Sequence, residues 1–316
     1  MDKSKKPKTV TSFEALGEVT GVTGSQPKKI IHLKSKTAMT ANAIQIPRSE
    51  HPNLGWIFYR NYFKRINFSY ITDGDNPAIE DSNARIITDR NNAIISNSSL
   101  VQIDDGLGVQ FIEAKVAYPG LVTGIGVTHE AGVKGEFKLG LHIDYTFGMP
   151  IIHGSSVKGL LRSVFPDFRQ GKDKHADSKL AWLIDFFKNQ LKIDVDVETI
   201  GQIKNEIFEG KNKYGGIDIY NRDLFFDAII IKADNDNRVM ASDALAPHGK
   251  NPLKNPIPLP FLKISSGCTI QFRFDLKDSK IVKELTPKNK VKLFEEIIRT
   301  LGIGAKTNVG YGQFEE

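Results

Sequence analysis

The chain has 316 residues, of which 40% are hydrophobic and 25% are charged, and it carries a formal net charge of +6 at pH 7. This composition is typical of a soluble globular protein and excludes a largely disordered chain, a collagen and a coiled coil, while no apolar run approaches the ~20 residues of a membrane helix and no apolar segment follows the N-terminus as in a secretory signal. The single cysteine, Cys268, excludes a disulfide framework and argues against a cysteine-based zinc site, so we expect a cytoplasmic protein.

The positive charge is concentrated at the N-terminus. Residues 1–36 contain eight lysines and three acidic residues, a net charge of +5, which leaves +1 for residues 37–316. The polar composition of residues 1–50 predicts a basic, partly disordered extension, followed by one domain over 51–316. Such an arm suits a polyanion or an acidic partner, although tails of this kind also serve only to keep a protein soluble.

Beyond the extension, the first half of the domain gives mixed signals. Apolar residues recur at helical spacing over 54–62, which predicts an amphipathic helix. Residues 72–106 are rich in Asp and Asn and predict a loop around one or two short strands. Residues 111–127 predict a strand interrupted by glycines, and the strict alternation over 137–145 predicts a half-buried strand.

The second half alternates helix and strand patterns. Apolar stripes predict helices over 155–165, with a serine as N-cap, and over 177–191. A nearly continuous apolar run predicts a central strand over 225–232, and alternation predicts another over 270–276. A Thr-Pro pair opens a predicted helix over 286–301.

This order of elements is not a regular βαβα series, so a parallel sheet is not expected. Short strands interleaved with a few helices favour an α+β fold with helices on one face of the sheet. A ferredoxin-like (RRM-like) βαββαβ core with long insertions fits the pattern.

The C-terminal stretch 302–312 is a glycine-rich motif that reads G-I-G-A-K-T-N-V-G-Y-G. Glycines at this density indicate close backbone approach or positive φ angles, and exposed N–H groups beside Lys306 suit a phosphate backbone. A Walker A loop is excluded because Ala305 precedes the lysine and a helix, rather than a strand, precedes the motif. An ordinary glycine-rich hairpin remains the alternative.

A second motif, over 148–162, reads G-M-P-I-I-H-G-S-S-V-K-G-L-L-R. Lys158 and Arg162 are four residues apart and share a face of the predicted helix. The start of that helix adds N–H groups and the hydroxyls of Ser155 and Ser156, a combination that suits an anion. The alternative is a solvated helix face.

Catalytic motifs are weak by comparison. Ser155 and Lys158 fit S-x-x-K, but the companions at 242–244 and 306–308 both lack the last residue of a serine acyl-enzyme motif. The seven histidines include no H-E-x-x-H pattern and no clear set of metal ligands. We therefore expect no cofactor and no metal.

Together the two motifs resemble those of the RAMP superfamily of CRISPR proteins. Residues 148–162 resemble its G-x-P-x-I-P-G-S-S-x-K-G-x-x-R signature, with His153 where proline is common, and 302–312 resemble its C-terminal glycine loop, about 140 residues later. Residues 121–132 fit the strand and loop before the signature. The stretches 246–250 and 256–262, and the helix around Trp56, resemble the sixth subunit of the type III-B (Cmr) effector.

This resemblance implies a non-catalytic, RNA-binding backbone subunit of a type III-B ribonucleoprotein in antiviral defence, placed near the 3′ end of the guide RNA. Its partners would be guide RNA, target RNA and the other subunits of the complex. The resemblance gives no catalytic residue. The residues expected to bind RNA are Ser155, Ser156, Lys158, Arg162, Gly302, Gly304, Lys306, Thr307, Gly310, Tyr311 and Gly312.

Two alternatives come from other classes of protein. RAMP relatives process guide RNA by histidine acid–base chemistry, which would make this chain a metal-independent endoribonuclease. Its candidate residues are His129, His142, His153 and His248. The other alternative is a basic α+β binding module unrelated to CRISPR.

Overall fold

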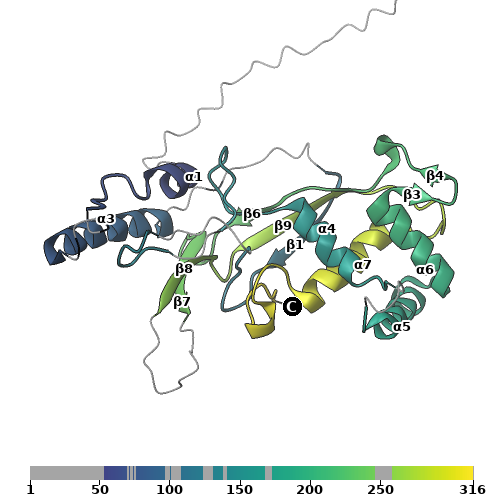
Figure 1. Ribbon diagram of the computed structural model, residues 1–316. Coiled ribbons are helices and arrows are strands. Elements are labelled where there is room, and N and C mark those ends of the chain that lie inside the picture. The colour runs from purple at the N-terminus through teal and green to yellow at the C-terminus, as the bar shows by residue number, and fades with distance from the viewer. Residues whose placement is uncertain are drawn as a thin grey trace, which may run out of the picture. The chain divides into compact units, whose positions relative to one another are not determined.

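The structure is a computed structural model, shown in Figure 1. It describes residues 53–69, 71, 74, 76–96, 100, 108–123, 131–137, 141–167, 173–245 and 258–315. All of them belong to one unit, Pro47–Glu316. The extension predicted over 1–50 lies outside the described residues.

The centre of this unit is an antiparallel sheet. Its strands are β1 (Gln110–Lys115), β2 (Ile151–Ile152), β5 (Leu224–Phe225), β6 (Ala228–Lys232) and β9 (Thr269–Asp275). They follow the order β1-β9-β6-β2, and β5 continues the line of β6 by pairing with the other end of β9. The central strand predicted over 225–232 is therefore present as β5 and β6, with a break at 226–227, and β9 and β2 lie on either side of β6.

The connections through two helices give the sheet a ferredoxin-like topology. Along the chain β1 is followed by helix α4 (Gly154–Ser163), then β6, β9 and helix α7 (Pro287–Leu301). The chain then returns to the sheet, where Phe314 forms an antiparallel bridge with Val116 at the end of β1. With the bridge at Phe314 in the place of the last strand, the spatial order is Phe314, β1, β9, β6, which matches the order last, first, third, second of a βαββαβ core. The predicted fold class is confirmed, with β2 as an added edge strand.

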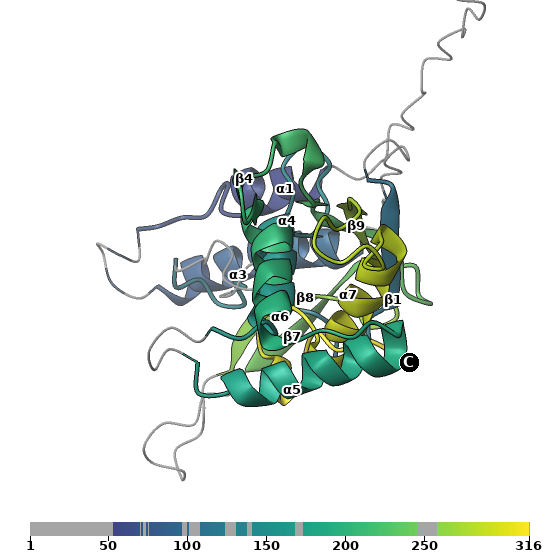
Figure 2. The same ribbon diagram turned by 90° about the vertical axis from the view of Figure 1, so that its right-hand side faces the viewer.

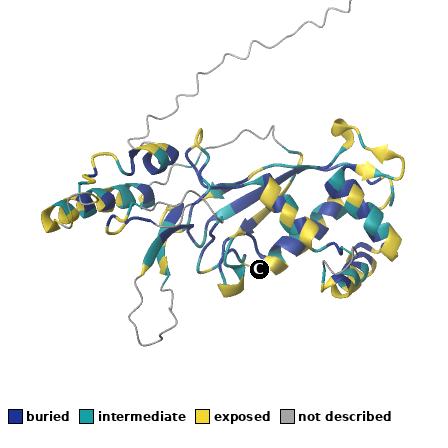
Figure 3. Ribbon diagram, viewed as in Figure 1, coloured by how far each residue is buried: buried dark blue, intermediate teal, exposed yellow. Residues whose placement is uncertain are grey.

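Helices α4 and α7 lie side by side in both views (Figures 1 and 2). The register of β1 with β9 places alternate side chains of both strands on the same face, and there Ile270, Phe272 and Phe274 are fully buried. Phe274 meets Phe294 of α7 with ring centroids 5.5 Å apart. Figure 3 shows the buried residues gathered on the sheet and on the adjacent faces of the helices.

The cap predicted for α7 is confirmed. Pro287 occupies the first turn, and the side chain of Thr286 accepts a hydrogen bond from the N–H of Asn289. Proline costs nothing there, because a first-turn N–H has no partner within the helix.

The core contains two insertions. The first lies between α4 and β5, and the second is a hairpin between β6 and β9. The first contains α5 (Ala176–Phe186), η2 (Phe187–Leu191), α6 (Val197–Lys204), η3 (Asn205–Glu209), β3 (Lys211–Asn212), β4 (Gly215–Gly216) and η4 (Ile219–Asn221). The second contains β7 (Met240–Leu245) and β8 (Leu259–Ile264). The helix predicted over 177–191 is thus confirmed as α5 and η2.

Before the sheet, the chain forms helical segments. They are α1 (Leu54–Trp56), η1 (Ile57–Asn61) and α3 (Pro77–Ile95). The helix predicted over 54–62 is confirmed. The loop predicted within 72–106 is wrong for 77–95, where Asn76 caps α3 and accepts hydrogen bonds from the N–H groups of Ala78 and Ile79.

The strand predictions before α4 are only partly correct. Of the strand expected over 111–127, the structure has a strand only as far as Lys115. Val116, Leu121 and Val122 form isolated bridges, and 124–127 lie outside the described residues. Of 137–145, residues 138–140 lie outside the described part, and the rest is not a strand. Ile143 makes a single bridge with Pro150, because the chain folds back at Asp144, whose carboxylate accepts the N–H of Phe147 at 2.7 Å.

Within the described ranges, no helix is both long enough and apolar enough to cross a membrane.

Candidate nucleic-acid interface

The first predicted motif folds into β2, a turn and α4. The helix begins at Gly154, and its N-cap is His153, which makes no capping bond through its side chain. The predicted serine cap is therefore wrong. Instead the carboxylate of Asp227 accepts the N–H of Gly154 at 2.7 Å. An acidic group thus occupies part of the positive end of the helix.

The two cations of this motif lie on one face of α4. The Nζ of Lys158 is 5.7 Å from the centre of the Phe225 ring, which places the charge over an aromatic face. Arg162 forms an ion pair with Glu209, with 2.7 Å between Nη2 and Oε1. Ser155 is exposed on the same side of the helix.

The glycines of the C-terminal loop are required by the fold itself. Gly302, Gly304, Gly310 and Gly312 all have positive φ angles, between 67° and 98°. A Cβ on Gly302 would lie 2.5 Å from the carbonyl oxygen of Gly312, and one on Gly304 would collide with the carbonyl of Val122. Only glycine combines these φ angles with such close backbone contact.

Much of the loop backbone is already hydrogen-bonded. The N–H of Ile303 donates to Gly312, that of Ala305 to Val122, and that of Gly312 to Gly120. The N–H groups of Val309, Gly310 and Tyr311 donate to carbonyls at 306 and 307. The N–H of Gly302 donates to Ile298, so the expectation of exposed N–H groups is wrong for seven of the eleven residues. An anion at this loop would have to use the N–H groups at 304 and 306–308.

Tyr311 attaches the loop to the β7–β8 hairpin. Its hydroxyl donates to Oδ2 of Asp243 at 2.9 Å, and the same oxygen accepts a bond from Nζ of Lys263 at 2.6 Å. Burial tends to raise the pKa of the Asp243 carboxyl, but the bonds from Lys263, Ala244 and Tyr311 together hold it below the usual value. Burial and then the bond to Asp243 raise the pKa of Tyr311 to about 12.

A cavity of about 500 Å³ joins the two motifs; we call it the glycine-loop cavity. It is lined by Thr123, Ser156, Leu160, Leu301, Gly302, Ile303, Gly304, Ala305 and Thr307. The structure thus brings Ser156 of α4 together with Gly302, Gly304 and Thr307 of the loop. Lys306, which lies between lining residues, is half-buried and has a φ of 64°.

Arg162 faces a different cavity, of about 530 Å³. Lys204 and Lys211 line that cavity with it, together with the acidic residues Asp167 and Glu209. The predicted cations of α4 and the glycine loop therefore do not form one surface. Arg162 lines the cavity on one side of α4, and the glycine loop lies on the other side, with Ser156 and Leu160.

Sequence reasoning missed three neighbours of this site. Asp227 could have been noticed in the sequence, because it is the one acidic residue within the apolar run 225–232. Thr123 gives no such signal. Tyr118 is 85% exposed, and its Tyr-Pro-Gly turn lies against the loop, since a Cβ on Gly310 would be 3.6 Å from Pro119.

Two candidate histidines meet near the start of α4. The rings of His142 and His153 are edge to face, with centroids 4.6 Å apart. Nδ1 of His153 is 3.8 Å from Oδ2 of Asp227, and the backbone N–H of His142 donates to the Thr123 hydroxyl at 2.9 Å. The other two candidates, His129 and His248, lie outside the described residues.

Three other kinds of site come into question in the described part of the chain: a metal site, a serine acyl-enzyme site and a reactive cysteine. This part contains no cluster of three His, Cys, Asp or Glu side chains suited to a metal ion. Of the S-x-x-K pattern and its companions, Lys158 lies over the ring of Phe225, and Asp243 is bonded to Lys263 and Tyr311. Burial raises the pKa of the Cys268 thiol to about 12, which makes it unreactive.

Comparison with known proteins gives one family match. The RAMP superfamily matches residues 103–315, a range that contains both motifs. A chain in a cryo-EM structure of the type III-B Cmr-beta bound to cognate target RNA is similar, with 20% identity, a TM-score of 0.47 and 83% and 85% of the two chains covered. Cmr6 from Pyrococcus furiosus has 22% identity and a TM-score of 0.38, with 68% of this chain and 99% of that chain covered. No curated protein matches the chain.

Proposed function

Because the chain belongs to the RAMP superfamily, we propose that it is an RNA-binding, non-catalytic backbone subunit of a type III-B CRISPR ribonucleoprotein. It would bind guide RNA near its 3′ end and support recognition of target RNA in antiviral defence in the cytoplasm. The observation that carries the proposal is the glycine-loop cavity, where both family motifs line one space. The choice of type III-B rests on the resemblance of 246–250 and 256–262 to the sixth subunit.

The lining of the glycine-loop cavity suits a sugar–phosphate backbone. Among the described residues, its polar side chains are the hydroxyls of Thr123, Ser156 and Thr307, and none of the described lining residues is a carboxylate. Hydroxyls and backbone N–H groups contact phosphates and sugars without reading sequence. Lys306 supplies the nearby positive charge. On the other side of α4, Lys158 and Arg162 would hold a neighbouring phosphate, and Arg162 would then exchange Glu209 for the RNA.

Charge removal tests these contacts. Full-length protein and the variants Lys306→Ala, Lys158→Ala and the double variant are titrated with labelled single-stranded RNA by fluorescence anisotropy at several salt concentrations. Each lost phosphate contact lowers the slope of log K against log salt by about 0.7. Lys283→Ala is the matched control, because this exposed lysine precedes the opposite end of α7. An unchanged affinity and slope in the double variant would contradict the site assignment.

Membership of the complex has its own test. A tagged full-length chain expressed with the other subunits and a CRISPR array should co-purify with them and with a short guide RNA. Recovery of the chain alone, while the other subunits assemble around the guide, would refute the proposed partners.

The contact between His142 and His153 favours a second candidate function, a metal-independent endoribonuclease. Acid–base cleavage needs two titratable groups within reach of one phosphodiester, and these rings are 4.6 Å apart beside Asp227. Labelled repeat RNA incubated with the protein in EDTA would then give a discrete cut that is lost in His153→Ala. The cut should persist in His175→Ala, which removes an exposed histidine at the start of α5. Intact RNA in all reactions would contradict this function.

A further inference from the structure

A second cavity, of about 360 Å³, is lined by residues of α4, α5 and α7. We call it the Trp182 cavity. Its walls are mainly apolar and include Val164, Trp182, Ile297 and Leu301. Three hydroxyl side chains, from Ser163, Ser178 and Thr300, complete the lining.

The Trp182 cavity continues the glycine-loop cavity. Ser156 and Leu160 line the first, Ser163 and Val164 line the second, and their spacing places all four on one stripe of α4. Leu301 lines both cavities and is 41% exposed. From Ser156 to Ser163 the helix rises about 10 Å. The two cavities therefore lie end to end between α4 and the C-terminal end of α7, which run side by side (Figures 1 and 2).

The tryptophan ring is supported by a neighbouring aromatic ring of the same helix. Trp182 is half-buried and stacks on Phe186, with ring centroids 5.5 Å apart and an interplanar angle of 23°. Phe186 is itself buried. A supported indole of this kind loses little freedom when a flat ligand stacks on it. Ring stacking with hydroxyls at the rim is how proteins hold unstacked bases of single-stranded RNA.

The charges at the Trp182 cavity also fit RNA. The one charged residue among its described lining residues is Lys179, a cation paired with Asp173 at 2.9 Å between Nζ and Oδ2. None of the described residues that line this cavity is a carboxylate. An apolar ligand without phosphates would fill the walls but would leave the adjoining hydroxyl-lined space unused. A nucleotide uses both.

We propose that the Trp182 cavity holds one base of a single-stranded RNA segment whose sugar–phosphate backbone lies in the glycine-loop cavity. This rests on the proposed RNA-binding function and adds a base-stacking contact to it. Because every base has an aromatic face, the contact tolerates any sequence.

The chain contains two tryptophans, Trp56 and Trp182, so the variant Trp56→Phe leaves Trp182 as the single fluorescent reporter. This full-length variant is titrated with a short single-stranded RNA, and separately with the same strand carrying abasic sites. The intact RNA should quench the Trp182 emission at the concentration where anisotropy reports binding. The abasic strand should bind several-fold more weakly and quench far less.

Substitution of the ring gives an independent measure. Trp182→Ala should weaken RNA binding about tenfold, whereas Trp182→Phe keeps a stacking surface and should retain most of the affinity. Trp56→Phe is the matched control and should bind as the unaltered protein does. Thermal melting of Trp182→Phe and Trp182→Ala separates loss of the contact from loss of the fold.

The outcomes separate this inference from the proposed function. RNA binding by anisotropy without quenching, or with no loss in Trp182→Ala, would overturn the base cavity and leave the RNA-binding function standing. Quenching by another subunit of the complex but not by RNA would overturn it as well and assign the cavity to a protein side chain. Failure of the chain to bind any RNA would refute both.

Discussion

Gly312 shows what a single residue of the C-terminal loop contributes. Its φ is 70°, and a Cβ there would collide with the carbonyl of Ile303, whose own N–H is bonded to the Gly312 carbonyl. The glycine pattern is thus explained by the fold before any ligand is considered. The loop glycines shape the cavity wall, while hydroxyls and cations are left to contact a ligand.

We therefore expect Gly312→Ala to destabilise the protein by at least about 1–2 kcal/mol, because alanine must adopt a left-handed conformation against a backbone atom. The measurement is urea unfolding. The matched control is Gly159→Ala in α4, where nothing lies within 4 Å of the added Cβ. This exposed helical site should gain about 0.5–1 kcal/mol. Equal effects at the two positions would disprove the argument.

Asp243 makes the attachment of the loop dependent on pH. Its pKa is held below the usual value of 3.8, so the ionised carboxylate stabilises the fold at higher pH, and this contribution is lost as the pH falls through the folded-state pKa. Asp243→Asn should therefore be less stable than the unaltered protein at pH 7. The two stabilities should converge as the pH falls below 3.8. A constant difference in urea unfolding from pH 7 to pH 3 would count against this role.

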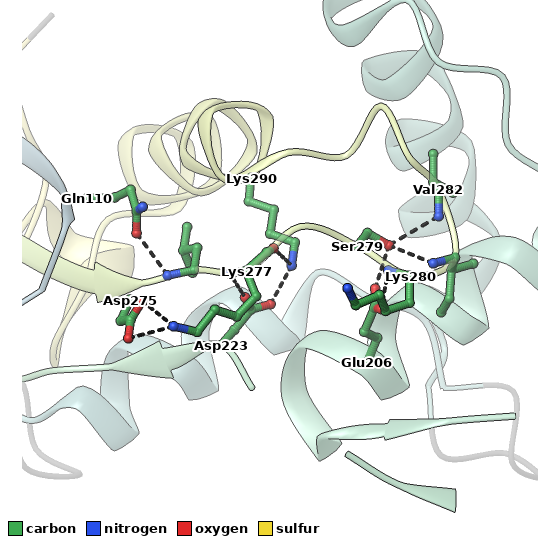
Figure 4. A network of polar contacts seen from close by, with 11 residues as sticks. Gln110, Glu206, Asp223, Asp275, Lys277, Ser279, Lys280, Val282 and Lys290 are labelled. Atoms are coloured by element: carbon green, nitrogen blue, oxygen red, sulfur yellow. Dashed lines mark hydrogen bonds and ion pairs between the residues drawn. The ribbon is translucent and has the colours of Figure 1, made fainter. Parts of the chain in front are cut away.

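At the scale of elements, α7 is fixed by a buried ion pair (Figure 4). Nζ of Lys290 is 2.7 Å from Oδ2 of Asp223, and both side chains are at most 2% exposed. Lys290 also donates to the carbonyl of Lys277, and Asp223 accepts the N–H of Lys277. Burial raises the pKa of Asp223 and the ammonium of Lys290 opposes that increase. The pair ties α7 to the residue before β5 and to the segment after β9.

Breaking this pair from one side should be costly. We expect Lys290→Met to lose about 3–5 kcal/mol, because it leaves a buried carboxylate unpaired. The double variant Asp223→Leu with Lys290→Met should lose less than the sum of the single variants. Lys277→Met is the control, since its pair with Asp275 is partly exposed and contributes about 0–1 kcal/mol. Urea unfolding of the five proteins measures the coupling, and strict additivity would rule it out.

The elements differ in how much of them the sequence could predict. The helix over 286–301 and the strand over 270–276 were predictable because cap residues and apolar periodicity agree there. Helix α3 was not, because only Asn83, Ile87 and Ile94 of its 19 residues are buried, so it carries hardly any apolar stripe. The alternation over 137–145 was misleading because Leu141 and Ile143 are both buried although Leu141 lies in irregular structure and Ile143 forms only an isolated bridge.

At the scale of the whole molecule, the topology followed from the order of elements, but the site did not. Both motifs could be found by residue type and spacing, and residues of both line the glycine-loop cavity. The separation of Arg162 from the glycine-loop cavity could not be foreseen, because it depends on residues far away in the chain. Glu209 draws Arg162 to one side of α4, and Asp227 occupies the start of the helix. Neither acidic residue belongs to a motif.

The contact of the C-terminal segment with the sheet leads to a prediction for the whole molecule. Phe314 bridges to Val116 at the end of β1, and its ring meets Phe272 of β9 with centroids 5.8 Å apart. Phe314→Ala should therefore destabilise the entire sheet by about 3 kcal/mol, because it removes a buried ring at the last strand position. Val309→Ala, at a residue 62% exposed in the same loop, should change stability by less than about 0.5 kcal/mol.

Hydrogen exchange locates the effect of Phe314→Ala. The amides of β1 should lose protection together with those of β9, because the two strands are paired along six residues of β1. The N–H of Glu315 donates to Lys115 and that of Ala117 donates to Gln313, so these should exchange first. Faster exchange confined to 307–315, with β1 unchanged, would mean that the C-terminal segment around Phe314 only covers the sheet edge and does not stabilise the core.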